Sequence, residues 1–227
     1  MKNFIKKLLY FLPNFLLKAG LGVCAIKMAS IFKYSFVIGS SHAMFSGTTA
    51  ATPLVGLFAG GLVSFAICAS SILLRYVLFG MGSLHLFAFY IPGLFAGFYF
   101  AYENKITRLF VPIVCMLLFL LHPVGRQAFA YCLFWLIPVG IYFVRSNTIF
   151  LHTLASSFIA HAVGSVIWIY TMPMTAGVWY ALIPIVCLER LVIASGMAIF
   201  YMGICFIKNK FAIFSRMYKM PIKTKVS

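Results

Sequence analysis

Apolar residues fill most of the chain in long runs, and short polar or glycine-containing stretches separate these runs. A helix that crosses a bilayer needs about 20 mostly apolar residues. Residues 40–48 and 80–84 are small, polar and glycine-containing, and residues 103–107 are charged, so the apolar runs end there. The pattern predicts helices over 12–39, 49–66, 67–80, 85–102, 108–122, 127–144, 149–170 and 178–206. The predicted fold is therefore all-α, a polytopic transmembrane helical bundle of six to eight spans.

Composition agrees with a membrane protein and excludes other classes. Of the 227 residues, 64% are apolar and 9% are charged, and the mean hydropathy is +1.07. A soluble domain averages about half apolar and about a quarter charged residues. These values exclude a soluble globular protein, a disordered tail and a nucleic-acid-binding module. We expect a single integral membrane domain over 1–227, with the helical bundle in 12–206.

Charge is concentrated at the two ends of the chain. Lysine and arginine total 18 against two acids, which gives a formal net charge of +16. Six cations lie in residues 1–33 and six more in residues 208–227. Basic tails beside apolar spans stay on the cytoplasmic side, so we expect 1–11 and 207–227 to be cytoplasmic ends of a multi-pass protein of the cytoplasmic (inner) membrane. Eight crossings satisfy this, and so do six if two short segments within 49–80 or 108–144 merge or re-enter.

Several chemistries are missing from the sequence. The six cysteines lie in apolar runs and form no Cys-x-x-Cys pair, so they predict neither a zinc site nor a disulfide framework. The chain has no Gly-x4-Gly-Lys-Ser/Thr loop for ATP and no His-Glu-x-x-His helix. Its two acids, Glu103 and Glu189, are far apart in the chain. We therefore expect no enzyme activity, no cofactor and no metal.

The clearest chemical signal is Glu189 followed by Arg190, near the middle of the last predicted span. A charge at that depth costs at least a few kcal/mol and needs a partner. His161 lies midway along 149–170, at a similar predicted depth. These three side chains are either contacts for a bound solute or a polar clamp between helices, and the sequence leaves both interpretations open.

A second group of candidate residues lies at the predicted outer ends of the helices. These residues carry hydroxyl, imidazole or aromatic groups: Ser41, His42, His85, Tyr170, Trp179 and Tyr180. Such groups suit a flat, partly polar small molecule that is stacked and hydrogen-bonded. The alternative is ordinary, because Trp and Tyr line membrane interfaces and Ser caps helices.

One short motif occurs twice. The sequence Gly-Leu-Phe-Ala-Gly occupies residues 56–60 and again residues 93–97. Glycines four apart on a helix let a second helix backbone approach closely in lipid. The motif therefore predicts close helix packing at these two segments.

The chain resembles the substrate-binding S components of the energy-coupling factor (ECF) transporters. The resemblance lies in the layout of 12–206, and above all in residues 53–60 (PLVGLFAG), 91–97 (IPGLFAG) and 179–194 (WYALIPIVCLERLVIA). It implies a solute-binding subunit for uptake of a vitamin-like small molecule, energised by separate ATPase subunits. It also implies that Ala25 and Ala29, four residues apart, form a face for the shared membrane scaffold subunit.

Three other functions remain open at this point. A self-sufficient secondary transporter would use broken helices at the midplane, and Pro92, Pro138 and Pro184 offer breaks. A structural membrane protein would bind no solute. A weaker resemblance, to the rhomboid intramembrane proteases, lies in residues 39–42 (GSSH) and 160–164 (AHAVG), where His42 stands in place of that family's glycine.

Overall fold

The computed structural model describes residues 2–36, 44–79, 85–144 and 147–218. Side chains are described for residues 11–33, 47–78, 89–144 and 147–210. Within these ranges the fold is helical apart from one short antiparallel hairpin, in which Lys33 lies opposite Ser46 and Phe36 lies opposite Met44. The all-α prediction is therefore confirmed in its main feature.

The longer elements are α1 (Lys2–Ala29), β1 (Lys33–Phe36), β2 (Met44–Ser46), α2 (Thr48–Ala59), α3 (Gly61–Phe79), α4 (His85–Ala101), α5 (Val111–Leu121), α9 (Ile149–Thr171) and α10 (Ala176–Tyr218). Between α4 and α9 lie shorter pieces: the π-helix η1 (Ile106–Phe110), α6 (Pro123–Gln127), α7 (Phe129–Cys132), the 3-10 helix η2 (Leu133–Trp135) and α8 (Leu136–Val144).

Among the described residues, four helices are long and apolar enough to cross a membrane: Phe11–Ala29, Gly61–Leu78, Ile149–Thr171 and Ala176–Lys210. Shorter apolar helices stand beside them. Large apolar side chains point outward on most elements, for example Leu73, Leu117 and Leu188. Such an exterior suits lipid rather than water. The protein is therefore a helical, multi-pass membrane protein. The number of crossings and the side on which the termini lie stay predictions.

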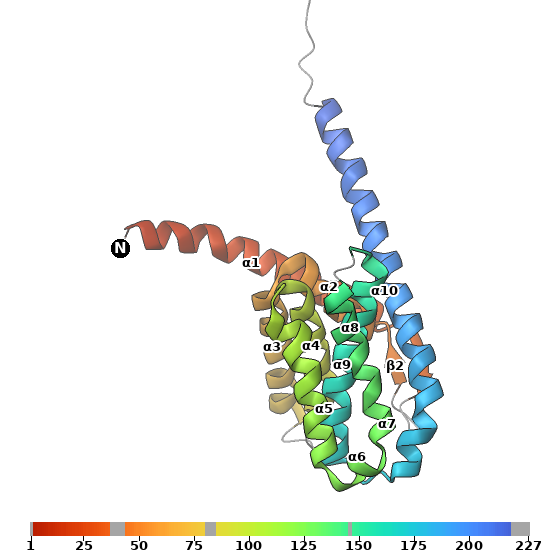
Figure 1. Ribbon diagram of the computed structural model, residues 1–227. Coiled ribbons are helices and arrows are strands. Elements are labelled where there is room, and N and C mark those ends of the chain that lie inside the picture. The colour runs from red at the N-terminus through yellow and green to blue at the C-terminus, as the bar shows by residue number, and fades with distance from the viewer. Residues whose placement is uncertain (1, 37–43, 80–84, 145–146, 219–227) are drawn as a thin grey trace, which may run out of the picture.

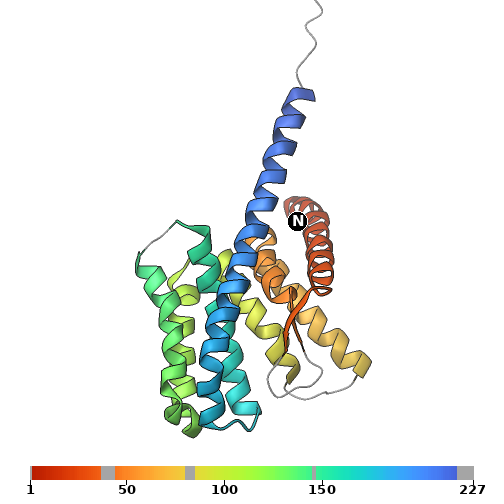
Figure 2. The same cartoon turned by 90° about the vertical axis from the view of Figure 1, so that its right-hand side faces the viewer.

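The helices stand side by side around α9, which packs against α4, α5, α8 and α10 (Figure 1). We call the end of this bundle that carries α6 the α6 end. At the opposite end, α10 continues beyond the other helices and α1 lies crosswise to them (Figures 1 and 2). At 1.5 Å per residue, the 43-residue α10 is about 65 Å long and the 23-residue α9 about 35 Å.

The prediction of one helix over 12–39 is wrong at its C-terminal part. Helix α1 ends at Ala29, where the Ser30 hydroxyl donates to the Lys27 carbonyl at 2.6 Å, and strand β1 follows at Lys33. Residues 31–36 read IFKYSF, in which β-branched and aromatic residues favour a strand. An apolar run alone does not separate a helix from a strand, which explains the error.

Other boundaries also differ from the prediction. The break between the second and third predicted helices lies at Gly60 rather than near residue 67, because Gly60 takes a φ of 92°, which suits glycine and ends α2. Helix α1 begins at Lys2 rather than at residue 12, and α10 runs to Tyr218 rather than to residue 206. The segment predicted over 127–144 is one apolar helix, Phe129–Val144, in which η2 is a tighter turn between α7 and α8. In contrast, α4 and α9 lie within one residue of their predicted bounds of 85–102 and 149–170.

The repeated glycine motif packs as predicted at Gly56, Gly93 and Gly97, whereas Gly60 ends α2 and packs against no other helix. A Cβ atom on Gly56 of α2 would collide with the backbone of Gly97 on α4, so the two helices touch at their backbones. One turn away, a Cβ atom on Gly93 would lie 2.9 Å from Cγ2 of Thr52. Helices α4 and α9 are joined in turn by a hydrogen bond in which the Ser156 hydroxyl donates to the Ala96 carbonyl at 3.0 Å.

Candidate functional site

A cavity of about 720 Å³ lies within the bundle, between α2, α3, α4, α9 and α10. The end of α1 and the residue Tyr131 of α7 complete its wall. Its polar and aromatic lining residues are Lys27, Ser30, Thr48, Thr49, Thr52, Ser64, Ser71, Arg75, Phe89, Tyr90, Tyr131, His161, Ser165, Trp168, Trp179, Glu189 and Arg190. A cavity of this volume accommodates a drug-sized molecule.

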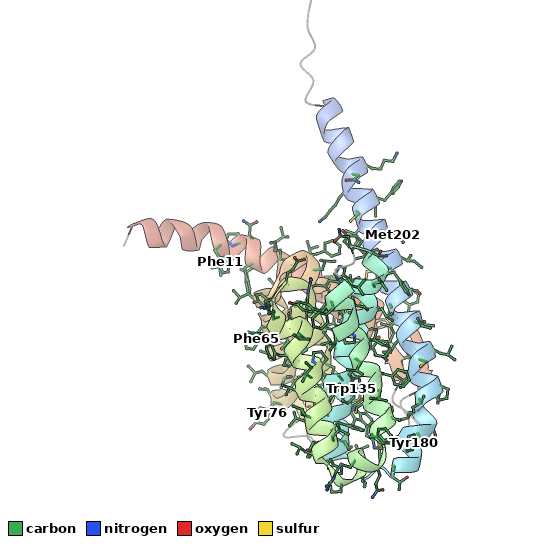
Figure 3. The ribbon with its side chains drawn as sticks, viewed as in Figure 1. Phe11, Phe65, Tyr76, Trp135, Tyr180 and Met202 are labelled. Atoms are coloured by element: carbon green, nitrogen blue, oxygen red, sulfur yellow. The ribbon has the colours of Figure 1, made fainter. Side chains whose placement is uncertain are left out.

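Aromatic rings form one wall of the cavity. The ring centroids of Tyr131 and Trp179 are 4.8 Å apart, and those of Tyr131 and His161 are 5.4 Å apart. Phe119 and Trp135 lie behind this wall, with the Phe119 centroid 5.2 Å from that of Trp179 and 5.3 Å from that of Trp135. Phe119, Tyr131, Trp135 and Trp179 belong to one buried cluster, and Trp135 lies within the bundle (Figure 3).

Helix α9 presents a spaced set of residues to the cavity. His161, Gly164, Ser165 and Trp168 follow one another at intervals of three, one and three residues, which places them on one face of the helix. The Tyr131 hydroxyl lies 3.4 Å from the Ser165 hydroxyl. Gly164 leaves space in the wall, because a Cβ atom there would meet only the ring of Pro92, at 3.4 Å.

The charged pair lies deep in the cavity. Arg190 is about 21 Å from the start of α10 at the α6 end, and only 6% of its surface is exposed. One of its terminal nitrogens, Nη2, lies 3.5 Å from Oε2 of Glu189, and Nη1 donates to the Ser157 carbonyl at 3.5 Å. Both distances are at the long limit of a hydrogen bond. For Glu189 and Arg190 the reason is that adjacent residues of a helix point about 100° apart.

The structure brings four of the predicted site residues together: His161, Trp179, Glu189 and Arg190 all line the cavity. Ser41 and His42 lie outside the described residues. His85 is the first residue of α4, and its side chain is not among those described.

Tyr170 and Tyr180 do not line this cavity. The Tyr170 hydroxyl donates to the Leu118 carbonyl at 2.8 Å, and the Tyr180 hydroxyl donates to the Gln127 carbonyl at 2.9 Å. Both rings are exposed, and Tyr180 lies towards the α6 end (Figure 3). They resemble interfacial tyrosines, whose rings face the lipid boundary while their hydroxyls bind backbone.

The two alanines of the predicted partner face on α1, Ala25 and Ala29, differ in exposure. Ala25 is exposed. Ala29 is half-buried and packs against Gly47, where a Cβ atom would lie 2.6 Å from the Ala29 carbonyl oxygen. A partner helix could therefore reach Ala25, while part of Ala29 is already used within the chain.

Sequence reasoning did not assign several cavity residues to the site. Tyr131, Ser165 and Lys27 were not among the predicted site residues. A signal existed for Ser64, Ser71 and Arg75, because their spacing of seven and four residues places them on one face of an apolar helix. For Tyr131 no local signal existed, since the turn at α6 brings it back to the cavity.

Among the described residues, no group of three His, Cys, Asp or Glu side chains could hold a metal ion. The described cysteines are free thiols. Comparisons with protein-family models, with curated proteins and with solved structures found no match to this chain. Arguments about function therefore rest on the cavity and on the chemistry of its lining.

Proposed function

We propose that this chain is a membrane-embedded solute-binding subunit that serves the uptake of a vitamin-like small molecule across the cytoplasmic membrane. The observation that carries the proposal is the cavity of about 720 Å³ between α2, α3, α4, α9 and α10. Interiors pack densely, and a void loses the contacts of its lining atoms. A purely structural protein would gain nothing from such a cavity, whereas a binding protein needs it.

The lining supports binding of a small, partly polar solute. Phe89, Tyr90 and Trp168 offer aromatic surface, and Thr52 and Ser71 line the same cavity with hydroxyl groups. Ligand sites combine a mostly apolar wall with a few polar groups that fix orientation. The proposal assigns no chemical reaction to this chain.

Separate subunits would supply the energy for transport. The sequence has no nucleotide-binding loop. The resemblance to ECF S components supports an arrangement with ATPase subunits and a scaffold membrane subunit. The exposed Ala25 of α1 is a position where a scaffold helix could approach closely.

The test is purification from the native membrane in mild detergent, followed by mass spectrometry of the bound proteins and of small molecules released by denaturation. A Gly164→Leu variant fills the cavity, because Gly164 faces open space there. Its matched control is Gly196→Leu, since Gly196 of α10 is exposed with no atom near its Cβ position. We expect the wild type and Gly196→Leu to release the same solute and Gly164→Leu to release none. Equal release from all three would place the binding site elsewhere.

A second function, a self-sufficient secondary transporter, is favoured by one observation. The apolar helix Phe129–Val144 tightens into the 3-10 helix η2 near its middle, and its residue Tyr131 lines the cavity. A 3-10 stretch within a helix often marks a hinge, and a hinged helix beside a buried site suits such a transporter. Reconstitution separates the two functions: uptake by the chain alone under an ion gradient supports the second, and uptake that requires co-purified ATPases supports the first.

A further inference from the structure

Positive charge dominates the cavity. Arg190 lies in its depth, and the exposed side chains of Lys27 and Arg75 line it from α1 and α3. Glu189 is the acid among the lining residues, so the formal balance is three cations against one acid. Between apolar helices such an excess acts over a longer range than in water, because the local dielectric constant is low.

The sequence contains no other acid that could neutralise this charge. It has two acids in total, Glu103 and Glu189. Glu103 lies outside the cavity, in the turn after α4, and forms an ion pair with Arg108 of η1, in which Oε1 lies 3.3 Å from Nη2. The positive balance of the cavity therefore holds whatever the remaining residues of the chain do.

Arg190 is also underused as a hydrogen-bond donor. A guanidinium has five N–H donors, and the two bonds described for Arg190 are both 3.5 Å long. Its Nε is buried and has no hydrogen-bond partner in the part of the chain that the structure describes. The same is true of Nε2 of His161, on the facing helix α9. A carboxylate or phosphate group supplies the paired acceptor oxygens that a guanidinium binds best.

The remainder of the site favours a flat molecule. Aromatic side chains with exposed surface line the cavity, among them Phe89, Tyr90 and Trp168. The packed rings of Tyr131 and Trp179 lie behind them in the wall. An aromatic or heteroaromatic ring packs on such a surface with little loss of side-chain entropy.

From this arrangement we infer that the solute is a planar organic anion, whose carboxylate or phosphate is bound by Arg190 while its ring lies against the aromatic lining of the cavity. Lys27 and Arg75 attract the anion to the cavity. This inference rests on the proposed solute-binding function and names the chemical class of the solute.

The test compares matched acids and amides on the purified full-length protein. Benzoate, nicotinate and anthranilate are titrated beside benzamide, nicotinamide and anthranilamide, and the shift of the melting temperature gives each affinity. The charge of any solute released from the natively purified protein is measured in parallel by ion-exchange chromatography and mass spectrometry. We expect the acids to bind at least about 10-fold more tightly than their amides, since a hydrogen bond to a charged group is roughly twice as strong as a neutral one.

Variants assign the effect to Arg190. Replacing Arg190 alone would leave Glu189 as an unpaired buried charge, which is strongly destabilising. The test therefore uses the double variant Glu189→Gln/Arg190→Gln, which removes both charges, beside the single variant Glu189→Gln. We expect the double variant to bind the acids about 10- to 100-fold more weakly and Glu189→Gln to bind them more tightly than the wild type. Arg108→Gln removes an arginine outside the cavity and serves as the matched control, with unchanged binding.

The outcomes separate this inference from the proposed function. Amides that bind as well as acids, or a released solute without negative charge, would overturn the anion and leave solute binding intact. Release of an anionic lipid in place of a planar acid would overturn the planar solute. If no probe shifts the melting temperature and no solute is released, both the anion and the solute-binding function fail.

Discussion

Substitution of Gly56 by alanine tests the contact that holds α2 against α4. A Cβ atom at residue 56 would collide with the backbone of Gly97, and a backbone atom cannot turn aside as a flexible side chain can. The two helices must therefore move apart. Thr52 and Gly93, one turn away on the same two helices, line the cavity, so the movement also widens the site.

The magnitude follows from two opposing effects. Overpacking of a close contact costs about 1–3 kcal/mol. Alanine gains about 1 kcal/mol over glycine in a helix, and this gain is common to any such substitution. Gly196→Ala is the matched control, because no atom lies within 4 Å of the Cβ position at Gly196. The difference in unfolding free energy between the two variants is therefore the overpacking cost alone, about 2 kcal/mol.

The assay is thermal unfolding of both variants in the same detergent, followed by circular dichroism or by dye labelling of the cysteines. For a chain of this size about 2 kcal/mol corresponds to a melting temperature about 4–8 °C lower for Gly56→Ala than for Gly196→Ala. Equal melting temperatures for the two variants would refute the backbone contact between α2 and α4.

Three further predictions test other parts of the fold. Ser156→Ala loses a hydrogen bond to the backbone of α4, whereas Ser157→Ala loses only a hydrogen bond within α9. In denaturation experiments Ser156→Ala should therefore lower the unfolding free energy by about 1 kcal/mol more than Ser157→Ala. Trp179→Ala removes a ring that is 2% exposed and should lower the unfolding free energy by about 3–5 kcal/mol, measured in the same way. A membrane-permeant maleimide should label exposed Cys24 in the folded protein and buried Cys132 only after denaturation, as peptide mass spectrometry would show.

Helix positions were predictable wherever the chemistry of the boundary is local. The polar or charged stretches before and after α4 and α9 stop these helices within one residue of the predicted bounds. The break at Gly60 was not predicted, because a glycine inside an apolar run is equally compatible with helix packing and with a helix end. The strand at Lys33–Phe36 was missed because its aromatic residues also fit a spanning helix.

The candidate site was predictable where a residue type is unusual for its position. Glu189, Arg190 and His161 stand out in apolar helices, because burying them without a partner is costly. The sequence left open whether they clamp helices or contact a solute. The contribution of Tyr131 depends on the path of the chain through α6 and η2, and such tertiary information is not present in the local pattern of residues.

The crosswise position of α1 bears on how the chain meets the bilayer. Helices α1 and α10 both have the length and composition of a membrane span, yet α1 lies crosswise to α10 (Figures 1 and 2). Both cannot lie along the membrane normal. If the upright helices α3, α4, α5, α9 and α10 cross the bilayer, α1 lies along its surface, where its lysines can reach anionic headgroups while its apolar side chains enter the lipid. Helix α1 and the C-terminal end of α10 then lie on the same side of the bilayer, which is the arrangement that the distribution of basic residues predicts.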